Sequence, residues 1–128
     1  MEFVKVKKSW GTEVWFENND LYCGKEITMD GGYWSSDGKF HYHKLKDETF
    51  YVLDGYLEVH LFGNGVLKHL TLKKGEALRI RPGTPHRFRA RYPNWPTKFV
   101  EVSTHHEDSD SYYDIQPPHL GSKEKSYA

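Results

Sequence analysis

The architecture follows from two stretches of the chain, His41-Tyr42-His43-Lys44-Leu45-Lys46-Asp47-Glu48 and Arg81-Pro82-Gly83-Thr84-Pro85-His86. Two imidazoles at positions i and i+2 of a strand lie on the same face, because strand side chains alternate. The short loop after them can return Glu48 beside the pair, and His86 follows directly after a Pro-Gly-Thr-Pro turn. Three imidazole nitrogens and one carboxylate oxygen suit borderline divalent ions. The sequence therefore predicts a metal site formed by His41, His43, Glu48 and His86.

The segments around these stretches have the pattern of short β-strands. Residues 49–53 run into the turn Asp54-Gly55 and out through residues 56–62. Asp-Gly between two such runs is a strong hairpin signal, because the tight turn needs positive φ angles. Apolar residues recur at spacing two, as in Leu57 and Val59, and no window has the spacing of an amphipathic helix. We therefore expect an all-β protein, a single small antiparallel β-barrel or jelly roll.

The length of 128 residues fits one domain. We expect the barrel to occupy residues 1–104, with the metal-binding motifs within residues 38–90. Residues 105–128 are polar and include Pro117-Pro118, so they are expected to form an arm over the barrel or a partly disordered tail. His105-His106 is expected to lie in a solvated polar turn rather than against a substrate.

The composition argues against several classes of protein. Lys plus Arg and Asp plus Glu both number 18, so a nucleic-acid surface or a polybasic membrane anchor has no support. No apolar run approaches the roughly 20 residues of a membrane span, and residues 1–5 lack the apolar stretch of a signal peptide. The single cysteine, Cys23, excludes an intrachain disulfide and fits a reducing compartment. We expect a cytoplasmic protein whose partner is a small molecule.

The spacing of the two stretches resembles the two sequence motifs of the cupin superfamily. His41-x-His43-x4-Glu48-x6-Gly55 is similar to the first motif. Gly75-x5-Arg81-Pro82-Gly83-x2-His86 is similar to the second. The resemblance implies a cupin fold in which the metal ligands are His41, His43, Glu48 and His86.

The sequence departs from the cupin motifs at three positions. Ser35 stands where the first motif has a glycine, Arg81 where the second has a proline, and Ala90 where the second has an asparagine. These departures affect a turn or a neighbouring contact, and none removes a ligand.

Within that superfamily the chain looks like the sugar-isomerase branch, namely D-lyxose isomerases and the cupin domain of mannose-6-phosphate isomerases. The similarity lies in residues 41–55, in residues 79–88, and in the strand 99–104 with the acidic turn 105–110. The resemblance implies aldose–ketose isomerisation or epimerisation of a sugar, with one divalent ion stabilising an enediolate. Manganese is the favoured ion, and zinc, iron, cobalt and nickel are alternatives.

Glu101 is the candidate general base of such a reaction. It alternates with Val100 and Val102 in the predicted strand, so two orientations are open. If the valines face the core, Glu101 is exposed; if the other face lines the interior, Glu101 is a buried carboxylate near the metal. The candidate substrate-binding residues are Lys46, Arg79, Arg81 and Tyr51.

Other functions remain open at this stage, because cupin folds host many activities. A cupin dioxygenase or an enzyme of a uronate pathway would use the same ligand types, and a non-catalytic sugar-binding cupin would keep the fold without turnover. We also expect a homodimer, in which residues 4–6 before Trp10 serve as a pairing or exchanged arm.

Overall fold

The computed structural model describes residues 3–118, and within this range the chain is built from β-strands with two short 3-10 turns and no α-helix. The strands are β1 (Val4–Lys8), β2 (Gly11–Asn18), β3 (Cys23–Met29), β4 (Glu48–Asp54), β5 (Tyr56–Gly63), β6 (Val66–Lys73), β7 (Ala77–Ile80), β8 (His86–Ala90) and β9 (Thr97–Ser103). The 3-10 turns are η1 (Ser35–Gly38) and η2 (Asp108–Asp110). No helix in the described range is long and apolar enough to cross a bilayer.

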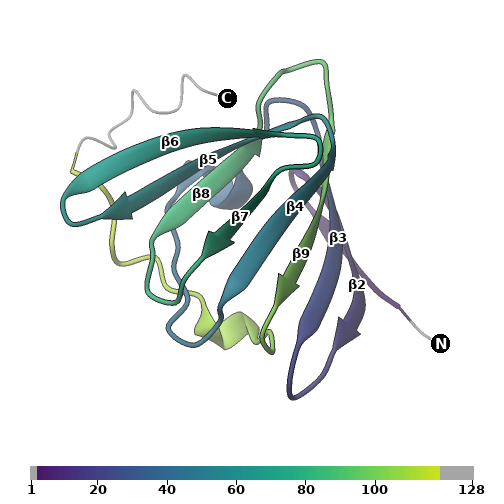
Figure 1. Ribbon diagram of the computed structural model, residues 1–128, viewed down its shortest axis with the longest axis horizontal. Coiled ribbons are helices and arrows are strands. Elements are labelled where there is room, and N and C mark those ends of the chain that lie inside the picture. Colours follow the sequence, from purple (N-terminus) through teal and green to yellow (C-terminus); the bar gives the residue numbers. More distant parts are fainter. Residues whose placement is uncertain (1–2, 119–128) are drawn as a thin grey trace.

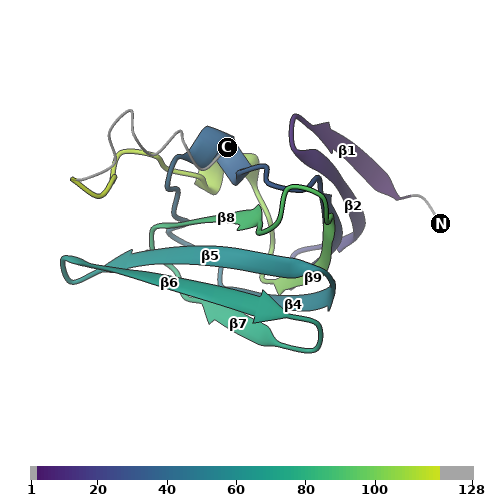
Figure 2. The same ribbon diagram turned by 90° about the horizontal axis from the view of Figure 1, so that it is seen from above.

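The strands form two antiparallel sheets (Figure 1). The larger sheet has the order β1-β2-β3-β9-β4-β7, and the smaller has the order β6-β5-β8. The expected all-β antiparallel architecture is therefore confirmed, but the sheets do not close into a barrel. Within the described residues β7 pairs with β4 and β6 with β5, and no ladder joins the two sheets at that side. A jelly-roll sandwich describes this arrangement, in which the smaller sheet lies across the larger one (Figure 2).

The core lies between the apolar faces of the two sheets. Phe50 of β4, Phe88 of β8 and Phe99 of β9 pack with ring centroids 5.0 to 5.7 Å apart. Leu57 and Val59 of β5 are fully buried, as their spacing of two predicts. This cluster fixes the relative position of β4, β8 and β9, the three strands that carry Glu48, His86 and Glu101.

The Asp54-Gly55 turn joins β4 to β5 and so carries the chain from the larger sheet to the smaller one. Gly55 has φ of +78°, and a Cβ atom there would lie 2.5 Å from the Pro96 carbonyl oxygen. Glycine is required at this position for both reasons.

The segment after β9 crosses the end of the molecule where β9 ends and β4 begins (Figure 1). Its backbone pairs with the segment before β4, because N–H and C=O of Tyr112 bond to C=O and N–H of Tyr42 at 3.0 Å each. The boundary at residue 104 remains a prediction, and residues 119–128 of the expected tail lie outside the described range.

Candidate metal centre

Three histidines from distant parts of the chain meet beside the start of β4. His41 and His43 lie in the extended segment between η1 and β4, and His86 is the first residue of β8. His41 and His86 form a two-residue antiparallel bridge, in which each backbone N–H donates to the other's carbonyl at 2.8 to 2.9 Å. This bridge brings the two sequence motifs together.

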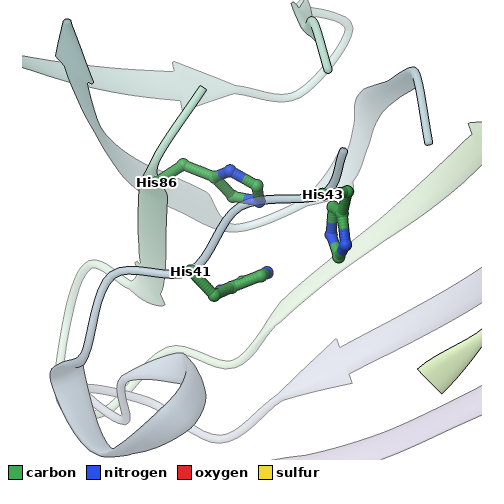
Figure 3. Close-up of side chains that lie close together, drawn as sticks. All are labelled: His41, His43 and His86. Atoms are coloured by element: carbon green, nitrogen blue, oxygen red, sulfur yellow. The ribbon is translucent and has the colours of Figure 1, made fainter. Parts of the chain in front are cut away.

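The three imidazole rings face one common space (Figure 3). One ring nitrogen from each of His41, His43 and His86 lies within 4.8 Å of the others. The ring centroids are 4.3 Å apart for His41 and His86, and 5.1 Å apart for His41 and His43. This is the separation expected of ligands that surround a single ion.

Two of these rings are oriented by backbone carbonyl groups. Nδ1 of His43 donates to the carbonyl oxygen of Asp110, and Nδ1 of His86 to that of Thr84, both at 2.8 Å. A neutral imidazole that donates from Nδ1 keeps its lone pair on Nε2. Both rings therefore present Nε2 to the space between them, as metal-ligating histidines do.

Glu48 completes the cluster on the side of His43 and His86. Its Oε2 atom lies 3.4 Å from Nε2 of His43 and 3.2 Å from Nε2 of His86, and its Oε1 atom lies 3.6 Å from Nζ of Lys46. Burial by itself raises the pKa of Glu48, but the net pKa lies well below its usual range, and the positive charge of Lys46 contributes to this lowering. Glu48 is therefore a carboxylate in the folded protein.

The donor set fits a divalent cation. Nδ1 of His41, Oε2 of Glu48 and Nε2 of His86 are buried without a well-directed hydrogen bond. Such atoms are costly unless something satisfies them, and an ion would do so. Burial, with smaller effects of His86 and His43, lowers the pKa of His41 well below its usual range. Its imidazole is therefore neutral and has a lone pair to donate.

A cavity of about 320 Å³ opens beside this cluster. It is lined by His41, His43 and Glu48 of the cluster, by the apolar side chains of Phe50 and Phe88, and by Lys46 and Glu101. The volume lies at the lower end of the range for small-molecule sites, roughly 300 to 1,000 Å³. A molecule the size of a monosaccharide is therefore a suitable occupant.

Glu101 lies on the cavity side of β9. It is 4% exposed, whereas its neighbour Val102 is 53% exposed. Its Oε2 atom accepts a hydrogen bond from Nζ of Lys46 at 3.1 Å. Burial lowers the pKa of Lys46, but Glu101 and Glu48 outweigh burial, so the net pKa is raised and Lys46 carries its charge.

The other predicted substrate contacts lie elsewhere. Tyr51 is 45% exposed, and Arg79 and Arg81 are also exposed. The guanidinium of Arg79 bonds to the half-buried Asp47. None of these three is among the residues that line the described cavity, whereas Lys46 is. Tyr51 in β4 and Arg79 in β7 occupy positions whose side chains point outward, away from the interior.

His106 is a cavity residue that the sequence patterns did not indicate. It is 9% exposed, and its Nδ1 atom lies 3.1 Å from Nζ of Lys46. The expected solvated turn is wrong for this residue, because Asn18 of β2 bonds to both its backbone N–H and its backbone C=O. That contact joins residues 88 positions apart, so local sequence carries no signal for it.

Comparison with known proteins agrees with this geometry. The cupin domain family matches residues 26–103, so the chain belongs to the cupin family. No match was found among curated proteins. The fold is shared with many solved structures, and the three described next are 13 to 20% identical to this chain.

Three of these structures show how the fold is used in chains of different length. Oxalate decarboxylase from Bacillus subtilis is 13% identical to this chain, with a TM-score of 0.74; the match covers 88% of this chain and 30% of the decarboxylase chain. The capsular polysaccharide assembling protein CapF from Staphylococcus aureus is 17% identical with a TM-score of 0.71, covering 88% and 32%. KdgF from Halomonas sp. is 20% identical with a TM-score of 0.67, covering 85% and 90%. This chain thus spans about a third of the first two and most of the third.

Proposed function

We propose that this cupin is a metal-dependent enzyme that isomerises or epimerises a sugar. The observation that supports the proposal is the presence of Glu101, hydrogen-bonded to Lys46, in the same cavity as His41 and His43, which form a cluster with His86. The arrangement combines a candidate ion site with a buried carboxylate able to move a proton.

The ligands in this proposal are His41, His43, Glu48 and His86. Manganese is the ion that we favour. Iron, cobalt, nickel and zinc are alternatives, because nitrogen and oxygen donors without thiolate suit all of these ions. When bound, a divalent ion would supply Lewis acidity to two neighbouring oxygens of the substrate.

Glu101 would act as the general base. In an aldose–ketose exchange it removes the proton from carbon 2, and the electron pair of that C–H bond forms the double bond of a cis-enediolate. The proton held on Glu101 can exchange with solvent before Glu101 delivers a proton to carbon 1, while the hydroxyl proton of O2 moves to O1. Lys46 orients the Glu101 carboxylate through the 3.1 Å hydrogen bond and places a positive charge beside the developing negative charge.

Solvent exchange tests this proposal directly. Protein loaded with manganese would be incubated in D2O with a panel of pentoses and hexoses, free and phosphorylated, and deuterium at carbon 2 followed by NMR. We expect exchange and ketose formation for at least one sugar. If no sugar in the panel exchanges, the isomerase proposal is wrong.

The same samples separate the other functions. Oxygen uptake by iron-loaded protein would favour a dioxygenase, and turnover of uronates alone would favour an enzyme of a uronate pathway. Sugar binding without turnover by metal-loaded protein would identify a binding module. A cytoplasmic location also remains a proposal; it rests on the single cysteine, Cys23, whose thiol is buried and whose pKa burial raises.

A further inference from the structure

We infer that Asp110, in the segment after β9, is a positioning residue that holds two of the candidate ligands in place. It neither lines the cavity nor serves as a candidate ligand, and it acts through the ring of His43 and the loop between His43 and Glu48. The inference rests on the metal-binding part of the proposed function and is independent of the substrate.

The Asp110 carboxylate binds the backbone of the loop that separates the two ligands. It accepts hydrogen bonds from the N–H groups of Lys44 at 2.9 Å, Leu45 at 3.2 Å and Lys46 at 3.1 Å. The side chain is 7% exposed, so these charge-assisted bonds are formed largely away from water. Three consecutive amides are thereby fixed by a single residue from another part of the chain.

The backbone of Asp110 acts on the first ligand itself. Its carbonyl oxygen accepts the proton of Nδ1 of His43 at 2.8 Å, which fixes the tautomer and the orientation of that ring. One residue therefore orients the His43 imidazole with its carbonyl and restrains the loop leading to Glu48 with its carboxylate.

The neighbouring contacts keep Asp110 in register with the ligand segment. Tyr112 pairs with the backbone of Tyr42, which lies between the ligands His41 and His43. The side chain of Gln116 bonds to both the N–H and the C=O of Phe40, at 2.9 and 2.7 Å. Residues 110–116 thus run alongside residues 40–46 and support them from the side away from β8.

Because Asp110 orders the ligand loop, it should raise the affinity of the site for a metal ion. A loop that is already ordered loses less conformational entropy when its ligands bind an ion, so the ion binds more tightly. Partners that orient metal ligands typically contribute a factor of about 10 to 100 in metal affinity. We expect an effect of that size from the Asp110 carboxylate.

The test measures Co²⁺ binding by the full-length protein, by calorimetry and by the visible absorption spectrum of the ion, which reports its coordination geometry. Asp110→Ala removes all three amide contacts, whereas Asp110→Asn keeps one carbonyl oxygen. Asp114→Ala is the matched control, because exposed Asp114 lies in the same segment but bonds to the hydroxyl of Tyr42 rather than to the ligand loop.

We expect Asp110→Ala to weaken Co²⁺ binding by about 10- to 100-fold and to alter the spectrum, with a smaller effect for Asp110→Asn and none for Asp114→Ala. Unchanged affinity and spectrum in Asp110→Ala would overturn the inference, and so would an equal loss in Asp114→Ala. If Asp110→Ala does not fold, Asp110→Asn decides by the same criteria.

The role of Asp110 and the isomerase activity can fail independently, and the wild-type protein distinguishes the two cases. Wild-type protein that binds Co²⁺ but turns over no sugar would contradict the isomerase and leave the role of Asp110 standing. Wild-type protein that binds no Co²⁺ would overturn both.

Discussion

Lys46 and Glu101 are 55 residues apart in sequence, yet Nζ of Lys46 lies 3.1 Å from Oε2 of Glu101 inside the cavity. Lys46 lies in the loop before β4 and Glu101 lies in β9, and the strands β4 and β9 pair in the larger sheet. The pair gives the cavity a carboxylate whose orientation is fixed and which lies on the same side as the candidate metal ligands.

Replacing Glu101 tests its role as the base. We expect Glu101→Gln to lower the rate of solvent exchange at carbon 2 by about 10²- to 10⁴-fold, because the amide cannot accept the proton. Co²⁺ binding should stay close to wild type, since Glu101 is not a proposed ligand. Val102→Ala, on the exposed side of the same strand, is the control and should keep full activity. Equal activity of the two variants would exclude Glu101 as the base.

Removing one ligand should abolish stabilisation by the ion. Manganese at 100 times its Kd should stabilise the wild-type fold by about 2.7 kcal/mol, because it binds only the folded state, and should raise Tm by several degrees. His86→Ala should lose this shift. His69→Ala, which removes an exposed imidazole of β6, should retain it. A manganese-dependent shift that survives in His86→Ala would place the ion elsewhere.

A second buried charge cluster, on the smaller sheet, predicts a pH-dependent contribution to stability. Glu58 lies 2.5 Å from Nε2 of His60 and accepts a hydrogen bond from Arg89. Burial raises the pKa of Glu58, but the contacts with His60 and Arg89 outweigh burial and lower the pKa from 4.5 to about 2. A carboxyl with a depressed folded-state pKa stabilises the protein fully above pH 4.5, and this contribution is lost as the pH falls toward 2.

Glu58→Gln should therefore lower the free energy of unfolding by about 2 kcal/mol at pH 7, measured by urea denaturation. The difference from wild type should shrink as the pH falls below 4.5. Glu26→Gln is the comparison, because Glu26 pairs with Lys98 on the surface and such pairs contribute little. A pH-independent difference for Glu58→Gln would show that its charge is not the cause.

The first strand predicts self-association. β1 pairs with β2 on one side, and its exposed Val4 lies on the strand at the edge of the larger sheet. Unpaired edges bind other strands readily, so we expect a homodimer with twice the monomer mass of 15.1 kDa in light scattering. Val4→Lys should weaken it, because a charge on an edge strand opposes pairing. A monomer at high concentration would refute this expectation.

Local sequence features predicted the parts of the fold that depend on neighbouring residues. The Asp54-Gly55 turn was predicted, and Gly55 has the expected positive φ. The hairpin predicted around it is wrong, because β4 and β5 lie in different sheets and do not pair. The alternation of Leu57 and Val59 identified the buried face of β5. The histidines of the two motifs lie together because a strand bridge joins them, and their spacing made that expectation possible.

Long-range contacts explain what the sequence could not show. The burial of His106 depends on Asn18 of β2, and the support of His43 depends on Asp110; neither pair has a local pattern. The side of β9 that faces the interior follows from its position between β3 and β4, so alternation alone left Glu101 undecided. A closed barrel was expected because strand spacing does not reveal which edges pair.

Anomalous X-ray diffraction from crystals grown with manganese would locate the ion in the protein. We expect a single strong anomalous peak about 2 Å from the ligand atoms of His41, His43, Glu48 and His86, enclosed by the three imidazole rings. A peak at another group of residues, or no peak within the three rings at saturating manganese, would contradict this expectation.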